Sequence, residues 1–243
     1  MIEHKNTFKI LLLIARPAAG KSEIIDYLKK TDLTERVARF HINEFDVIDD
    51  FPMIWTWFEE DQLLEEMVLP RLHTTPENYF LDNYFWHLLI RKICLEYNNL
   101  LRDDPNYHEH KTAILEFSRG KQSGGYTAAF KHLSKQVIDH LAVMVVNVSW
   151  EESLRKNRAR FNPNRPNSIL EHGLSDEKME ILYKEDDLEA LCANDPAYLN
   201  IQGKNVPYAV FENEDDVTTA RGKALGDRLE QTLDLLWKRW NSR

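Results

Sequence analysis

Residues 8–28 read FKILLLIARPAAGKSEIIDYL and contain three structural signals in succession. The apolar run at 10–14 predicts a buried strand, and residues 15–22, ARPAAGKS, follow it as a loop. Ile24, Ile25 and Leu28 then recur at helical spacing, which predicts a helix that buries one side. Strand, loop and helix in this order form the context that a phosphate-binding loop requires.

The residue types of the 15–22 loop suit phosphate. Backbone N–H groups after Pro17, together with the start of the helix, attract an anion, and Gly20 lets the backbone approach it without a Cβ clash. Lys21 would reach the β and γ phosphates, and the Ser22 hydroxyl would hold Mg²⁺. The alternative interpretation is an ordinary turn between a strand and a helix with an exposed lysine.

This loop resembles the Walker A motif of P-loop NTPases, with Ala15 where the strict motif has Gly. The resemblance implies ATP, or another nucleoside triphosphate, and Mg²⁺ as cofactors. The nucleotide-binding residues that it implies are Ala15, Arg16, Pro17, Ala18, Ala19, Gly20, Lys21, Ser22 and Glu23.

Size and composition limit the class of protein. The chain has 243 residues, 43% of them hydrophobic and 29% charged, which suits one α/β domain. A net charge of -9 argues against long nucleic acid and anionic membrane as partners. Two cysteines form no disulfide or metal framework, so we expect a reducing, cytoplasmic location. The apolar runs are too short for a membrane span, and the first is too short for a signal peptide.

Further strand signals follow at 36–42, 112–117, 141–148 and 206–211, with helical patterns between them. We therefore expect a three-layer α/β fold with a mainly parallel five-stranded sheet and helices on both faces. The sequence predicts a helical insertion at about 51–110 and a lid-like segment at about 155–175. The whole chain, 1–243, is predicted to be a single P-loop kinase-like domain.

Two strand ends carry candidate acceptor-side or metal-binding groups. Asp46 follows the predicted strand at 36–42 and could accept a hydrogen bond from a substrate hydroxyl. Glu44, Asp49 and Asp50 are instead interpreted as part of a solvated loop.

Glu116 closes the 112–117 strand and could hold Mg²⁺ through water or orient an attacking hydroxyl. Arg119 could bind phosphate or carboxylate with its guanidinium fork. The alternative for both is an ion pair at the strand edge. The run ILEFSRG resembles the I-L-D-G-F-P-R segment of adenylate-kinase-type nucleotide kinases, which places Glu116 at the Asp position and Arg119 at the Arg position.

The helix after residue 149 ends in a basic cluster of Arg155, Arg158 and Arg160. Basic side chains stabilise any helix C-terminus, which is the simpler interpretation. In nucleoside and nucleotide kinases, however, the helix after the fourth strand carries lid arginines, and this segment is similar. That resemblance also implies that Asn213, after the last strand, frames the adenine ring.

The resulting hypothesis is an ATP- and Mg²⁺-dependent phosphotransferase acting on a small molecule such as a nucleoside, nucleotide or sugar derivative. Lys21, Glu116, Arg119 and Arg158 are the predicted catalytic residues, and Ser22 and Glu116 the metal ligands. Arg155 and Asn213 extend the cofactor site; Asp46, Arg119 and Arg160 bind substrate.

Other functions stay open. The chain could be a nucleotide-binding regulatory ATPase or interaction protein, or a kinase of nucleic-acid ends or of a sugar nucleotide. A guanine-specific N-K-x-D motif does not occur in the sequence. Besides the nucleotide and the acceptor, a second copy of the chain is considered as a partner. The chain also resembles an uncharacterised bacterial P-loop family with the runs ILEFSRG, NRARFNP and VPYAVFENEDDVTT, which supplies no substrate.

Overall fold

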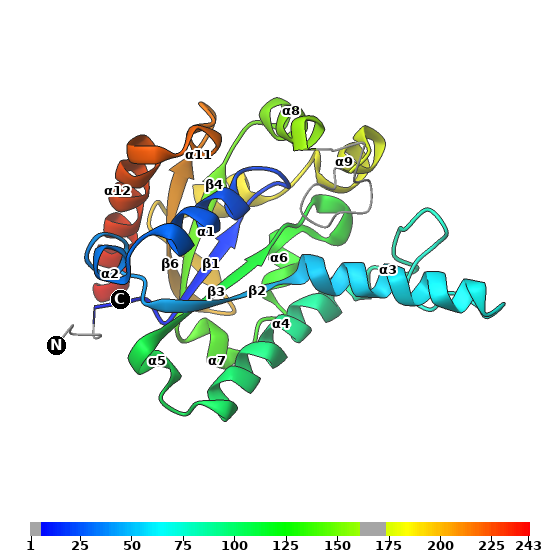
Figure 1. The fold of residues 1–243 in the computed structure, drawn as a ribbon, viewed down its shortest axis with the longest axis horizontal. Helices are drawn as coiled ribbons and strands as arrows, with labels where there is room; N and C mark the ends of the chain where they lie inside the picture. Colours follow the sequence, from blue (N-terminus) through cyan, green and yellow to red (C-terminus); the bar gives the residue numbers. More distant parts are fainter. Residues whose placement is uncertain (1–5, 161–173) are drawn as a thin grey trace.

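The computed structural model describes residues 6–160 and 174–243. Within these ranges, six strands form one sheet in the order β2-β3-β1-β4-β6-β5 (Figure 1). The strands are β1 (Ile10–Ile14), β2 (Glu44–Asp49), β3 (Lys111–Phe117), β4 (Leu141–Asn147), β5 (Tyr198–Ile201) and β6 (Lys204–Glu212). All neighbours are parallel except β5, which pairs antiparallel with β6.

The register of the parallel strands brings their carboxyl ends together. Glu116 of β3 pairs with Leu13 of β1 on one side and with Asp49 of β2 on the other. The loops that follow these three strands therefore leave the same edge of the sheet, where open α/β sheets bind ligands.

Helices pack on both faces of the sheet, because alternate strand residues point to opposite sides. On one face, Leu11, Leu13 and Met144 pack against apolar residues of α1 (Lys21–Lys30) and α12 (Gly222–Asn241). Nearby lie α2 (Leu33–Phe40) and the short α11 (Val217–Ala220).

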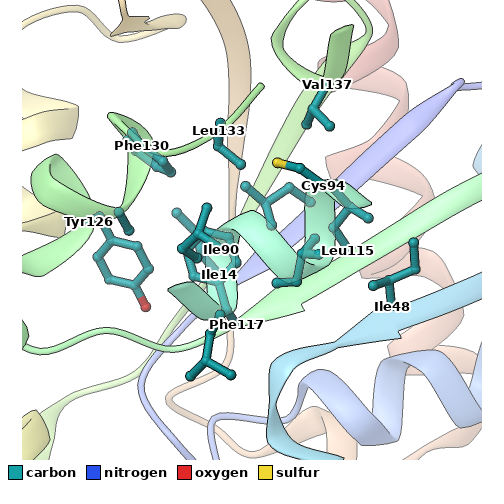
Figure 2. Packing of buried hydrophobic residues seen from close by; sticks show 14 of the residues in the cluster. Ile14, Ile48, Ile90, Cys94, Leu115, Phe117, Tyr126, Phe130, Leu133 and Val137 are labelled. Carbon is teal, nitrogen blue, oxygen red and sulfur yellow. The ribbon is translucent and has the colours of Figure 1, made fainter. Parts of the chain in front are cut away.

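On the other face, Ile14, Leu115 and Phe117 pack with Ile90 and Cys94 of α4 (Tyr84–Asp103), as Figure 2 shows. The short helices α6 (Gly125–Phe130) and α7 (Lys135–Ile138) complete this layer. The central strands are buried on both faces, as their continuous apolar character predicts.

Helix α3 (Asp50–Glu66) continues directly from β2 and projects from the body of the molecule beside α4 (Figure 1). The remaining helices are α5 (Tyr107–His110), a 3₁₀ turn at Lys121–Ser123, α8 (Trp150–Arg160), α9 (Asp176–Tyr183) and α10 (Leu188–Ala193). None of the helices in the described ranges combines the length and apolarity needed to cross a bilayer.

The α/β class, the mainly parallel sheet and the helices on both faces are confirmed, as are four of the five predicted strands. The strand predicted at 36–42 is wrong: residues 33–40 form helix α2. The second strand comes later, at Glu44–Asp49, and β5 is an additional strand, so the described sheet has six strands rather than five.

A buried carboxylate ties the segment after α3 back onto that helix. Asp61 of α3 is fully buried and accepts hydrogen bonds from the backbone N–H of Leu72 (2.7 Å) and Thr74 (2.6 Å) and from the Thr74 hydroxyl (2.7 Å). His73 contacts the same carboxylate and stacks on Trp57, with ring centroids 5.2 Å apart. These contacts fix the segment that forms one wall of the cavity described below.

We expect Asp61→Ala to lower the free energy of unfolding by about 2–3 kcal/mol, because it leaves buried donors without an acceptor. Burial by itself raises the pKa of Asp61, but the hydrogen bonds from Thr74, Leu72 and His73 outweigh it and lower the pKa to about 2. The stabilisation of the fold by the ionised Asp61 carboxylate is therefore complete above the ordinary aspartate pKa, and it is lost as pH falls toward 2.

Urea unfolding at pH 7 and at pH 3 measures this effect, with Glu66→Ala, an exposed position of the same helix, as the control. A difference between Asp61→Ala and wild type that stays the same at both pH values would contradict the assignment to the ionised carboxylate.

Candidate active site

The 15–22 loop adopts a conformation that depends on glycine at its end. Gly20 has φ +113° and lies at the N-terminus of α1. A Cβ at this position would lie 2.6 Å from the Thr218 hydroxyl oxygen and 2.7 Å from Nδ2 of Asn213. Only glycine accommodates both the positive φ and this close approach.

Asn213 lies behind the loop rather than in the cavity in front of it. Its side chain is fully buried, and Nδ2 donates to the Ala19 carbonyl (2.7 Å) and to the Thr218 hydroxyl (2.8 Å). Its Oδ1 accepts from the Thr218 N–H at 3.2 Å. One contact holds the loop backbone at Ala19 and two hold Thr218 of α11, so Asn213 ties the loop to α11 and is not among the residues that line the cavity.

Lys21 opens α1 at the carboxyl edge of the sheet. Its Nζ donates to the Ser118 hydroxyl (2.8 Å) and lies 3.8 Å from the Glu116 carboxylate. Burial raises the pKa of Glu116, and the positive charge of Lys21 opposes that rise. The two side chains proposed from separate motifs thus meet across β1 and β3.

Two further carboxylates join them at the end of β2. Asp49 caps α3, accepting a hydrogen bond from the Phe51 N–H at 3.0 Å. Burial, with the negative charges of Glu116 and Asp50, raises the pKa of Asp49 to about 7. The interpretation of Asp49 and Asp50 as part of a solvated loop is wrong, because Asp49 ends a strand and Asp50 is 4% exposed.

Arg119 is held in place by its neighbours. Its guanidinium pairs with Asp50 at 2.6 Å and also donates to the carbonyls of Ser118 (2.6 Å) and Trp86 (3.1 Å). It lies over the Trp86 ring, 5.1 Å from the centroid. The structure therefore joins β3, the start of α3 and α4 through this one buried side chain.

These groups face one cavity of about 830 Å³. Its loop end is lined by residues 17–23, Asp49, Asp50, Glu116, Arg119 and Arg160. Most of the predicted site residues are thus brought to a single space, and Asp49 and Asp50 are added to them. The signal that could have found these two is their position directly before the apolar start of a helix, where Asp serves as an N-cap.

Other predicted residues point elsewhere. Ala15 is buried, and its carbonyl accepts from the Tyr126 hydroxyl at 2.9 Å. Arg16 pairs with Asp186 at 2.5 Å, in the segment after α9. Asp46 lies three residues before the end of β2. Its carboxylate accepts hydrogen bonds from the Tyr107 hydroxyl (3.0 Å) and from Nζ of Lys111 (3.1 Å).

The arginines of α8 divide into two groups. Arg155 pairs with Glu152 and Asp216, and Arg158 pairs with Asp176; both arginines are exposed and outside the cavity lining. Arg160 lines the cavity. Within the predicted lid-like segment, residues 161–173 lie outside the described residues.

The donor set near Lys21 suits a hard cation. The Ser22 hydroxyl and the Glu116 carboxylate offer oxygen atoms, the ligand type that Mg²⁺ prefers, and Mg²⁺ completes its shell with phosphate oxygens and water. Among residues 6–160 and 174–243, no three His, Cys, Asp or Glu side chains form a metal-binding group by themselves.

Comparison of the sequence with protein-family models and with curated proteins finds no match. Among solved structures, the chain is similar to an unliganded sugar kinase from Janibacter sp. HTCC2649, with TM-score 0.42 and 11% identity over 94% of this chain and 95% of that one. It is also similar to the protein APE1195, with TM-score 0.40 and 15% identity over 94% of this chain and 98% of that one. Likeness at this level assigns neither a family nor a substrate.

Proposed function

We propose that this protein is a P-loop kinase that transfers the γ-phosphoryl group of ATP to a hydroxyl of a small molecule, with Mg²⁺ as cofactor. The observation that carries the proposal is the meeting of Lys21 and Ser22, at the start of α1, with Asp49 and Glu116 in one cavity. In this proposal Lys21 is the phosphate-binding cation, and it lies in the same cavity as carboxylates that suit acid–base chemistry.

In this proposal the acceptor oxygen forms a bond to the γ-phosphorus while the bond from that phosphorus to the β–γ bridging oxygen breaks, and ADP leaves. The acceptor hydroxyl gives its proton to Asp49, whose pKa of about 7 matches a base that works near neutral pH. Lys21 and the first N–H groups of α1 bind the phosphates, and Arg160 neutralises charge on the transferring group.

Ser22 and Glu116, the latter through water, would hold Mg²⁺, which offsets phosphate charge when bound. Arg119 acts as a positioning residue that holds the start of α3 against β3 and α4, because its guanidinium is already engaged by Asp50 and by the carbonyls of Ser118 and Trp86. The chain would form one kinase-like domain, with residues 51–110 as the insertion that covers the acceptor, working in the cytoplasm.

A regulatory nucleotide-binding protein is the second candidate, since the 15–22 loop alone serves both functions. The position of Asp49 favours the enzyme. A second carboxylate, paired with Glu116 across the strands and lining the same cavity as the loop, can take up a proton during phosphoryl transfer and is not needed for binding.

Calorimetric titration with ATP, with and without Mg²⁺, tests the proposal. We expect Mg²⁺ to strengthen ATP binding at least about tenfold, and Ser22→Ala to remove that gain, because the hydroxyl is the protein ligand of the metal. Ser242→Ala, an exposed position near the C-terminus, is the matched control. Failure of the wild-type protein to bind ATP in either condition would refute the proposed function.

A further inference from the structure

The cavity extends well beyond the groups that handle phosphate. Residues of α3 that line it recur every three or four positions and so share one face of the helix: Phe51, Ile54, Trp55, Phe58, Glu59, Gln62 and Glu65. At 1.5 Å per residue, the stretch from Phe51 to Glu65 is about 21 Å long. The lining therefore follows α3 for most of its length.

The α3 wall changes character along its length. From Phe51 to Phe58 it is aromatic and aliphatic, with the Phe51 and Trp55 rings 6.0 Å apart and those of Trp55 and Phe58 6.2 Å apart. From Glu59 onward it is polar. At the far end, Arg71 pairs with Glu65 at 2.9 Å, so these two charges offset each other.

Aromatic side chains also line the cavity from the segment before α4 and from α4 itself. Phe80 and Trp86 belong to the lining, and their ring centroids lie 4.7 Å apart in an edge-to-face arrangement. Ile181 and Leu182 of α9 add aliphatic lining. Polar side chains also line the cavity, among them Asn83, Gln122 and Asn157. The stretch from Phe51 to Phe58, with Phe80 and Trp86, offers apolar area and ring faces, which suit a planar ring better than the hydroxyls of a compact polyol.

We propose that the phosphate acceptor is an elongated alcohol, with its reactive hydroxyl beside Lys21 and Asp49 and an uncharged ring packed against Trp55 and Phe58. This inference rests on the proposed function and narrows its substrate class to alcohols that carry a planar ring, in place of compact sugars and polyols without one. Trp55 and Phe58 are then residues that determine specificity.

Two pairs of probes test this, since the members of each pair differ by a ring: glucose with phenyl β-glucoside, and ribose with uridine. Binding to the full-length protein is measured by calorimetry with a non-hydrolysable ATP analogue and Mg²⁺ present. We expect at least one of the ring-bearing probes, phenyl β-glucoside and uridine, to bind about tenfold or more tightly than the sugar that lacks the added planar ring.

Trp55→Ala and, separately, Phe58→Ala should reduce that advantage to about twofold or less, with melting temperatures recorded to exclude unfolding. Leu63→Ala, an exposed position of the same helix outside the cavity lining, should retain it. An advantage for phenyl β-glucoside alone would identify an aryl ring as the ligand chemistry, and one for uridine alone a nucleobase-like ring.

Equal affinity within both pairs, no binding of either ring-bearing probe, or an advantage that survives in both ring variants would overturn the inference. The same samples report on MgATP binding. If wild type binds MgATP and the probe results are negative, the substrate class is wrong and the phosphotransferase proposal stands. If MgATP does not bind, the proposed function itself has failed.

Discussion

Lys21→Ala is expected to lower phosphotransfer by a factor of about 10³ or more and to weaken MgATP binding by a factor of about 10². The lysine Nζ is held 2.8 Å from the Ser118 hydroxyl and 3.8 Å from Glu116, at the start of α1. A phosphate bound by the 15–22 loop would thus meet a cation that is already positioned. Calorimetry measures the loss of binding, and a coupled ADP-release assay measures the loss of turnover.

Lys29→Ala is the matched control, because Lys29 lies in the last turn of the same helix and is exposed. It should bind and turn over MgATP like wild type. Normal turnover by Lys21→Ala would rule out the phosphate-binding role of the loop. A comparison of melting temperatures separates this role from a fold defect, since the variant also removes the positive charge that faces Glu116.

The first strand and its loop could be predicted from the sequence, because their signals are local. An apolar run that is buried on both faces and a glycine that ends a loop are visible in consecutive residues. The second strand was misplaced for a physical reason. Residues 36–42 are apolar enough for a strand, but Val37 and Phe40 are three apart and both buried, and Asp32 caps the helix through the Thr34 N–H.

The true second strand is hard to detect because it lies at the edge of the sheet. Residues 44–49, EFDVID, carry three acidic side chains, and only Ile48 is buried. Such a strand has one pairing partner, β3, and resembles a loop in composition. With a strand predicted at 36–42, Asp46 is the acidic residue expected just beyond its end, whereas β2 ends at Asp49, which lines the cavity.

The direction of a side chain is the other property that the sequence does not contain. Arg158 and Arg160 belong to one basic cluster, yet Arg158 pairs with Asp176 and Arg160 lines the cavity. Asn213 follows the last long strand as predicted, but its amide faces the back of the loop, because Thr218 and the Ala19 carbonyl engage it. Both outcomes depend on partners outside the local pattern: Asp176 is 18 residues from Arg158, and Ala19 is 194 residues from Asn213.

Asp49→Asn is expected to lower kcat by a factor of about 10²–10⁴, because asparagine cannot take up the acceptor proton. The amide still caps α3 through the Phe51 N–H, so the helix start is retained. In wild type, kcat/KM should rise with pH through about 7 as Asp49 ionises in the free enzyme, and the variant should lose this dependence. Asp46→Asn makes the same chemical change in the same strand, outside the cavity, and should leave the profile unchanged.

The same substitution should stabilise the protein at high pH. Because the folded-state pKa of Asp49, about 7, lies above the ordinary aspartate value, the native state holds this proton more tightly than the unfolded state. The contribution of Asp49 to the free energy of unfolding is therefore largest below the ordinary aspartate pKa and is lost as pH rises through 7. Asparagine carries no charge, so the variant does not bear the cost of a buried, ionised Asp49 at high pH. Melting temperatures of Asp49→Asn and wild type should coincide near pH 4 and differ at pH 8 in favour of the variant, by about 2–4 °C for each kcal/mol. An active variant with a wild-type pH profile would remove Asp49 from the mechanism, and a lower melting temperature at pH 8 would show that its carboxylate stabilises the fold.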